Sequence, residues 1–167
     1  MRVIAPYTAF APGVAEALDA TGWAWHPVDV SGSPRAYWDL LDDLWRECRT
    51  FAIVEHDVIV QPDLIDHLVA CPADWCAYPI EYFNGPYAGL GCAKFGAGLI
   101  SSNPFAIDAV GGMSDAGHEA KHFCRLDAWL QQVLGRNGAT MHVHSPVLRH
   151  VRPYAGPPQP SHGCVSL

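Results

Sequence analysis

Residues 51–60 read Phe-Ala-Ile-Val-Glu-His-Asp-Val-Ile-Val: four apolar side chains, three polar ones, then three apolar ones again. Four consecutive apolar residues are typical of a strand that is buried on both faces, as at the centre of a mostly parallel sheet. The polar residues Glu55, His56 and Asp57 follow directly, so we expect them where the backbone leaves the core. Ligands of open α/β sheets bind beyond the carboxyl ends of strands, which makes this segment the first candidate for a functional site.

The segments on both sides alternate between strand and helix patterns. In residues 37–48, apolar side chains recur at three- and four-residue intervals, which predicts an amphipathic helix. The other expected helices are 14–20, 62–70 and 122–136, and the expected strands are 2–7, 23–30, 51–54, 97–101 and 140–144. Residues 71–96, rich in Cys, Trp, Tyr, Phe, Gly and Pro, are expected to be irregular. Strands that alternate with helices predict an α/β sandwich.

Length and composition favour one folded domain. The chain has 167 residues, of which 50% are apolar and 16% charged, so it can build a core and is not a disordered chain. With 10 basic against 17 acidic residues, the net charge of −7 argues against general nucleic-acid binding, which needs a basic surface. No apolar run approaches the ~20 residues that span a bilayer, and residues 1–10 lack the apolar region of a signal peptide. We therefore expect a cytoplasmic protein without a membrane span.

The six cysteines fit neither a disulfide scaffold nor a zinc site. They stand at positions 48, 71, 76, 92, 124 and 164, and no Cys-x-x-Cys pair occurs. A structural zinc site is therefore not expected. Cys71 and Cys76 could be bridged in an oxidising compartment, but reduced and buried thiols are the expectation for a chain without a secretory signal.

Glu55 and Asp57 are candidate metal ligands. They are two residues apart, so an extended segment would place both carboxylates on one face. Two carboxylates side by side are stabilised by a positive charge between them, and Mg²⁺ or Mn²⁺ prefers carboxylate oxygens. The alternative is a charged turn that caps the following helix.

A glycine-rich segment, residues 85–98, is a candidate ligand-facing loop. It has glycine at positions 85, 89, 91, 96 and 98, which would let a ligand approach the backbone closely. It contains neither a Gly-x-Gly-x-x-Gly nor a Gly-Lys-Ser/Thr signature, so a Rossmann or P-loop nucleotide site is not supported. The alternative is an ordinary long loop.

Polar residues in the last third of the chain are further candidates. Asp127 lies at the edge of the apolar stripe of helix 122–136, where partial desolvation raises a carboxyl pKa and suits a base. The alternative is an aspartate that interacts with the helix dipole. His142, His144 and His150 could contribute metal ligands, or could occupy a solvated strand face. Two arginines, Arg149 and Arg152, flank His150 and could meet phosphates.

The order of these features resembles that of the GT-A glycosyltransferases. Glu55-His56-Asp57 resembles their DxD metal motif, with Glu in the first place, and residues 89–98 resemble their glycine-rich loop. Arg125-Leu126-Asp127 resembles their xED motif, with Leu where Glu usually stands. His150, or alternatively His144, resembles the C-terminal histidine that completes the metal site. The resemblance implies a three-layer α/β/α sandwich with a central mixed, mostly parallel sheet in residues 1–152, followed by a Pro-rich C-terminal arm, 153–167.

The resemblance also implies an activity and a set of site residues. The expected enzyme is a hexosyltransferase-type glycosyltransferase, which transfers a sugar from a nucleotide-diphosphate sugar such as a UDP-sugar to an acceptor hydroxyl with inversion. Mn²⁺ or Mg²⁺ would be held by Asp57, Glu55 and His150, and Asp127 would be the catalytic base. The expected donor-binding residues are Pro6, Tyr7, Thr8, Arg35, Glu55, His56, Gly91, Lys94 and Arg152. The expected acceptor-binding residues are Trp75, Tyr78, Tyr82 and Phe83, whose rings could stack on sugars.

Two alternative functions stay open at this point. One is a nucleotidyltransferase, which would share the sheet and the acidic pair but normally has a basic phosphate-binding loop near the N-terminus. The other is a non-catalytic module that binds a nucleotide sugar, consistent with the missing xED glutamate. The acceptor could be a sugar, a protein or a small molecule. Because 167 residues suffice only for the donor half of such an enzyme, acceptor binding would rest on the Pro-rich arm or on a second subunit of a homodimer.

Overall fold

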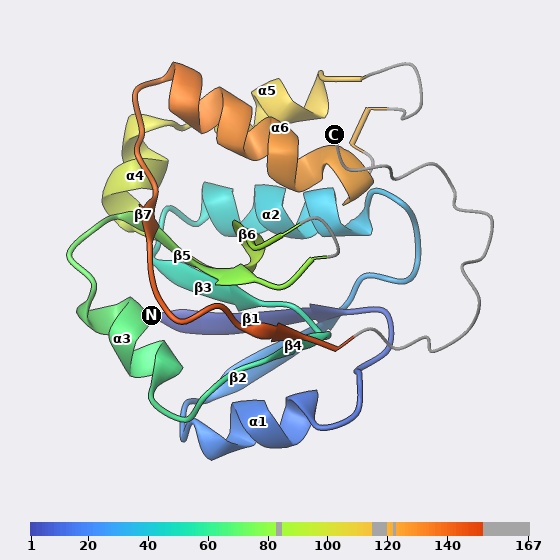
Figure 1. Cartoon of the computed structure of the whole chain (residues 1–167). Helices are drawn as coiled ribbons and strands as arrows, with labels where there is room; N and C mark the ends of the chain where they lie inside the picture. Colours follow the sequence, from blue (N-terminus) through green and yellow to red (C-terminus); the bar gives the residue numbers. More distant parts are fainter. Residues whose placement is uncertain (83–84, 115–119, 122, 152–167) are drawn as a thin grey trace.

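The central element of the protein is a six-stranded mixed sheet (Figure 1). The computed structural model describes residues 1–82, 85–114, 120–121 and 123–151. Within these, the strands of the main sheet are β1 (Arg2–Tyr7), β2 (Trp25–Asp29), β3 (Phe51–Val54), β5 (Trp75–Ile80), β6 (Tyr87–Phe95) and β7 (His142–Val143). Their order across the sheet is β2-β1-β3-β6-β5-β7. Strand β6 is antiparallel to both of its neighbours, and the other strands run in one direction.

Helices cover both faces of this sheet. They are α1 (Val14–Ala20), α2 (Ala36–Arg46), α3 (Leu64–Ala70), α4 (Ala97–Ser102), α5 (Ala106–Gly111) and α6 (Phe123–Arg136). Figure 1 shows α2, α5 and α6 on one side of the sheet and α1 and α3 on the other.

Strand β3 faces both layers of helices. Phe51 and Ile53 are buried in one apolar cluster together with α2 and α6, and Ala52 and Val54 are buried in a second cluster together with α1 and α3. A strand with apolar side chains on both faces therefore lies at the centre of the sandwich, as its sequence predicts. The predicted α/β/α sandwich with a mostly parallel sheet is confirmed.

Two predictions of local structure are wrong. The segment 71–96, expected to be irregular, contains β5 and β6, so Gly89 and Gly91 lie in a strand rather than in a loop. The segment 97–101, expected to be a strand, begins helix α4. Its neighbouring residues Leu99 and Ile100 are both buried, which one turn of helix permits and strict alternation in a strand does not.

A small second sheet brings the end of the described chain back to the residues that follow β3. Strand β4 (Val58–Ile59) pairs in antiparallel fashion with β8 (Arg149–His150), with Val58 opposite His150. The backbone N–H of Val151 also donates to the carbonyl of Asp57, at 2.7 Å. Residues 149–151 are thereby held beside the turn that carries Glu55, His56 and Asp57.

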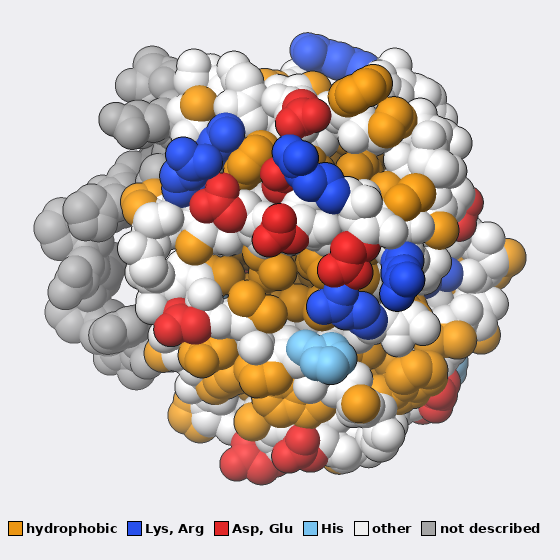
Figure 2. All heavy atoms as spheres, turned by 180° about the vertical axis from the view of Figure 1, so that it is seen from behind, with side chains coloured by type: hydrophobic (Ala, Val, Ile, Leu, Met, Phe, Trp, Pro, Cys, Tyr) orange, Lys and Arg blue, Asp and Glu red, His pale blue; other side chains and the backbone are white. Residues whose placement is uncertain are grey.

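The surface carries charges of both signs close together. Figure 2 shows acidic and basic side chains interspersed on one face. Ion pairs join Arg2 to Glu47, Arg35 to Asp39 and Arg46 to Asp42. Among the helices of the described residues, none has the length and apolar character needed to cross a bilayer. The predicted C-terminal arm, 153–167, lies outside the described residues.

Candidate functional site

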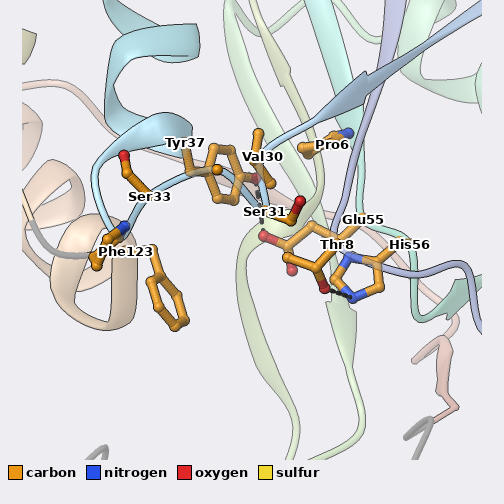
Figure 3. Close-up of a pocket in the computed structure, with 11 residues that line it drawn as sticks. Pro6, Thr8, Val30, Ser31, Ser33, Tyr37, Glu55, His56 and Phe123 are labelled. Atoms are coloured by element: carbon orange, nitrogen blue, oxygen red, sulfur yellow. Dashed lines mark hydrogen bonds between the residues drawn. The ribbon is translucent and has the colours of Figure 1, made fainter.

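A pocket of about 570 Å³ opens at the edge of the sheet where β1, β2 and β3 end (Figure 3). Its walls come from the ends of these strands, from the loop after β2 and from the start of two helices. The lining residues are Pro6, Thr8, Val30, Ser31, Gly32, Ser33, Pro34, Tyr37, Glu55, His56 and Phe123. The pocket lies at the carboxyl ends of parallel strands, where ligands of α/β sheets usually bind.

Backbone hydrogen bonds hold the walls of the pocket together. The N–H of Val30 donates to the carbonyl of Tyr7, and the N–H of Phe123 donates to the carbonyl of Pro34. The loop of residues 30–34 is thus fixed between β1 and the start of α6. Figure 3 shows Phe123 and Ser33 on one side of the pocket and Thr8 and His56 on the other.

Glu55 lines the pocket and also lies close to the charged groups of Asp57, Asp127 and His150. The Tyr37 hydroxyl donates a hydrogen bond of 2.8 Å to its Oε1 atom. Burial raises the pKa of Glu55 to about 7, the negative charge of Asp57 adds to the rise, and the bond from Tyr37 opposes it. Near neutral pH this carboxyl therefore changes its protonation state readily, and a nearby cation would favour the ionised form.

Asp57 lies beside Glu55 in a tight turn rather than in the extended segment that its sequence predicts. The N–H of Val58 donates to the carbonyl of Glu55, which closes the turn. The Oδ2 atom of Asp57 lies 2.8 Å from Nε2 of His150, whereas its Oδ1 atom is buried and has no hydrogen-bond partner among the described residues. A buried carboxylate oxygen without a partner is costly, and a hard divalent cation would satisfy it. The residues present thus fit a Mg²⁺ or Mn²⁺ ion.

Asp127, on α6, approaches the same edge of the sheet from the layer of helices. Gln131 donates a hydrogen bond of 3.1 Å to its Oδ1 atom, and the backbone N–H of Leu90 also donates to the carboxyl. A Cβ at Gly89 would lie 2.6 Å from both Cγ and Oδ1 of Asp127, so the missing side chain of this glycine makes room for the carboxyl. Burial raises the pKa of Asp127 to about 6, and the hydrogen bonds from Gln131 and Leu90 lower it.

The three carboxyl groups act on one another. The charges of both Asp57 and Asp127 raise the pKa of Glu55, and the charge of His150 lowers it. Such a concentration of negative charge is stable only if protons or a cation offset it. The arrangement therefore suits the binding of a cation and the removal of a proton from a ligand at the same edge of the sheet.

Three residues predicted to contact ligands lie in the core instead. Lys94, expected to bind the donor, is 6% exposed, and its Nζ donates to the carbonyl of Cys71. Trp75, 6% exposed, lies at the start of β5, level with the start of β3, whereas Glu55 follows the end of β3. Tyr78, 1% exposed, is packed beneath α3. None of the three lines the pocket, because the strands β5 and β6 turn these side chains inward.

The other predicted residues are divided between the site and the rest of the molecule. Pro6, Thr8 and His56 line the pocket, and Thr8 Oγ1 lies 3.4 Å from His56 Nε2. A Cβ at Gly91 would lie 3.6 Å from Glu55 Oε2, so Gly91 borders the site.

Two of the remaining predicted residues lie outside the pocket lining. The Tyr7 ring stacks on Phe10, with centroids 4.8 Å apart, and Arg35 pairs with Asp39 on the surface.

Near His150, the Tyr82 ring lies with its centroid 5.0 Å from that of the histidine, at the side of the site. His144, the alternative to His150, lies instead against Tyr78, with ring centroids 4.8 Å apart. Phe83 and Arg152 lie outside the described residues.

Sequence reasoning missed several residues of this site. The pattern of its helix presents Tyr37 only as an apolar position, yet its hydroxyl donates a hydrogen bond to Glu55. Gln131 stands four residues after Asp127, a spacing at which two side chains meet on a helix, and this signal could have identified it. The loop of residues 31–34 carries no motif, and only the fold reveals that it lines the pocket.

Comparisons with known proteins show a shared fold. No protein-family model matches the sequence, and no curated protein matches it either. Among solved structures, a glycosyltransferase involved in the glycosylation of the major capsid of PBCV-1 is similar with a TM-score of 0.56 and 9% identity, over 89% of this chain and 92% of that one. A197 from STIV is similar with a TM-score of 0.55 and 11% identity, over 89% of this chain and 83% of that one. At these identities the likeness concerns the architecture of the sheet and its helices.

Proposed function

We propose that this protein is a metal-dependent glycosyltransferase that transfers a sugar from a nucleotide-diphosphate sugar to an acceptor hydroxyl with inversion. The observation that carries the proposal is the meeting of Glu55, Asp57, Asp127 and His150 at one edge of the sheet, beside the pocket. The similarity in fold to a glycosyltransferase supports it.

The pocket would hold the nucleoside of the donor. Its volume of about 570 Å³ lies within the usual range of small-molecule sites, and its lining combines apolar side chains with a few polar groups. Ser31, Ser33 and Thr8 offer hydroxyl groups for the base and the ribose, and Phe123 offers a ring for stacking. The diphosphate would then extend toward Glu55 and Asp57.

The carboxylates would hold a divalent cation at the diphosphate. Asp57 would contribute its unpartnered Oδ1 atom, with Glu55 and His150 as further ligands. When bound, Mn²⁺ or Mg²⁺ would offset the negative charge that develops on the departing diphosphate. The Nε2 atom of His150 lies 2.8 Å from Oδ2 of Asp57, so these two proposed ligands are already adjacent.

Asp127 would act as the base toward the acceptor. Its carboxyl is held by Gln131 and by the backbone of Leu90, and a pKa of about 6 leaves it mostly ionised at neutral pH and able to accept a proton. As the acceptor hydroxyl gives its proton to Asp127, its oxygen forms a bond to the anomeric carbon. The bond from that carbon to the diphosphate oxygen breaks, and its electron pair leaves with the nucleoside diphosphate. A single displacement of this kind inverts the anomeric centre.

Aromatic side chains beside the site would contact the acceptor. Tyr82 and Tyr87 meet edge to face, with ring centroids 6.0 Å apart, and the Tyr87 hydroxyl accepts a hydrogen bond from Gln131, which also binds Asp127. Rings next to a catalytic base are a suitable platform for a sugar.

A panel of nucleotide sugars tests the proposal. The purified chain is incubated with UDP- and GDP-sugars with and without Mn²⁺, and the released nucleoside diphosphate is measured, since water can replace the acceptor. We expect metal-dependent release with at least one donor and its loss in Asp127→Asn, whereas Asp108→Asn, an exposed change on α5, serves as the control. Donor binding without turnover would favour a non-catalytic binding module. Release of pyrophosphate from a nucleoside triphosphate would favour a nucleotidyltransferase.

A further inference from the structure

A second cluster of metal-ligating side chains lies outside the pocket, where helix α3 meets the edge of the sheet. Cys71 caps the C-terminus of α3, Cys76 lies in β5, and His144 directly follows β7. One sulfur from each cysteine and one ring nitrogen of His144 lie within 4.8 Å of one another. We propose that these three side chains are the protein ligands of a zinc ion.

Secondary structure, rather than closeness in sequence, brings the three residues together. Strands β5 and β7 pair in parallel, with Cys76 opposite His142. The backbone N–H of His144 donates to the carbonyl of Ala77 at 2.9 Å, and its ring stacks on Tyr78 with an interplanar angle of 17°. The histidine is thus held in place by the backbone and by an aromatic neighbour before any metal binds.

The two cysteines are buried, and one ring nitrogen of His144 lacks a hydrogen-bond partner among the described residues. Cys71 is 9% exposed and Cys76 is fully buried, and both are free thiols. The Nε2 atom of His144 is buried and has no hydrogen-bond partner among the described residues. Because a buried nitrogen without a partner costs free energy, a ligand that bonds to the imidazole would stabilise the fold.

The spacing and the chemistry of the donors suit zinc. With Zn–S bonds of about 2.3 Å and Zn–N bonds of about 2.0 Å, neighbouring ligands of a tetrahedral ion lie about 3.5–3.8 Å apart. Donors already within 4.8 Å need to approach by no more than about 1.3 Å. Thiolate and imidazole donors favour Zn²⁺ over Mg²⁺ or Mn²⁺, which prefer the oxygens offered by Asp57.

Binding would leave the net charge of this part of the core unchanged. Zn²⁺ forms bonds to the two sulfurs as both thiol protons leave to solvent, so two thiolates balance the ion. The Nζ atom of the buried Lys94 donates to the carbonyl of Cys71, next to this site. Ion binding therefore adds no uncompensated charge next to this lysine.

Zinc would stabilise the position of β7, the edge strand from which the chain continues to His150 and Asp57. Strand β7 has two residues, and its register with β5 covers Cys76 to His142 and Ala77 to Val143. The chain continues from His144 to β8, which carries His150 to Asp57. A bond from zinc to His144 would link this segment to α3 and β5, and the inference does not depend on the proposed glycosyl transfer.

Metal content and cobalt spectroscopy test the site. The full chain is stripped with a chelator under reducing conditions, loaded with Zn²⁺ or Co²⁺ and desalted. We expect about one Zn²⁺ per chain, and with Co²⁺ an intense near-ultraviolet band from thiolate-to-metal charge transfer, because two ligands are sulfur. Loss of a ligand in Cys76→Ser or His144→Gln should weaken Zn²⁺ affinity more than about 100-fold. Mutation of residues that merely hydrogen-bond to metal ligands already lowers metal affinity by about 10–100-fold.

Matched variants separate this site from other metal-binding groups. Cys48→Ser removes an exposed thiol and should leave Zn²⁺ affinity unchanged, and Asp57→Asn should leave the charge-transfer band unchanged. His144→Gln changes a partly exposed side chain and keeps the test valid if Cys76→Ser fails to fold, as judged by circular dichroism. Unchanged Zn²⁺ affinity in a folded His144→Gln, absence of the cobalt band, or a Cys71–Cys76 disulfide found by mass spectrometry would each overturn the proposal.

Discussion

Replacing Gly89 by alanine should displace the carboxyl of Asp127, the proposed base, while Asp127 itself is not substituted. A Cβ at this position would collide with Oδ2 of Asp127 and lie 2.6 Å from its Cγ and Oδ1 atoms, whereas ordinary contacts begin at 3.4 Å. The carboxyl must therefore withdraw by more than about 1 Å and would lose its hydrogen bonds from Leu90 and Gln131. A displacement of about 1 Å in a catalytic group can cost about 100-fold in rate, which corresponds to about 2.7 kcal/mol.

The assay is the release of nucleoside diphosphate from a donor sugar at saturating Mn²⁺. We expect kcat to fall about 100-fold in Gly89→Ala, with donor affinity and the circular dichroism spectrum unchanged. Gly135→Ala is the matched control, because a Cβ at Gly135 on α6 meets no atom within 4 Å. A folded Gly89→Ala with the turnover of the unaltered protein would refute the reasoning, since a displaced Asp127 could not then be the base.

Three further predictions follow from the same geometry. Turnover should rise with pH through about 6, because Asp127 accepts a proton only when ionised, and a rate profile without this step would contradict its role. Tyr37→Phe removes a hydrogen bond that lowers the pKa of Glu55, so Mn²⁺ affinity measured by electron paramagnetic resonance should fall at pH about 7 and recover at pH about 9. Lys94→Met leaves the carbonyl of Cys71 without its partner and should cost about 1–3 kcal/mol in urea unfolding, with no change in donor affinity.

The parts of the fold that could be predicted are those with a strong periodic signal. The apolar run 51–54 and the helices around residues 37–48 and 122–136 have patterns that few other structures share. The polar turn of residues 55–57 could be placed at the carboxyl end of β3 because it directly follows this apolar run. Strands β5 and β6 were missed because aromatic, glycine and proline residues, which usually indicate loops, here fill a strand pair.

Prediction of the site failed where it depended on which way a strand turns its side chains. Lys94 carries a charge and lies in a glycine-rich segment, which favours a position facing a ligand. Pairing of β6 with β3 and β5 turns its side chain into the core instead. The contact of Asp57 with His150 joins residues far apart in the chain, and it could be expected only from the order of motifs. Cys71, Cys76 and His144 follow no spacing that suggests a metal site, because the pairing of β5 with β7 creates their proximity.

The most direct test of the metal site at Asp57 is calorimetric titration of the chain with UDP and GDP, with and without Mn²⁺. We expect Mn²⁺ to strengthen binding of at least one of them more than about tenfold, which is about 1.4 kcal/mol, and expect Asp57→Asn to abolish this gain. Asp43→Asn, an exposed change on α2, should retain it. Equal affinities with and without Mn²⁺, or an Asp57→Asn variant with the full gain, would contradict a metal-dependent donor site at this turn.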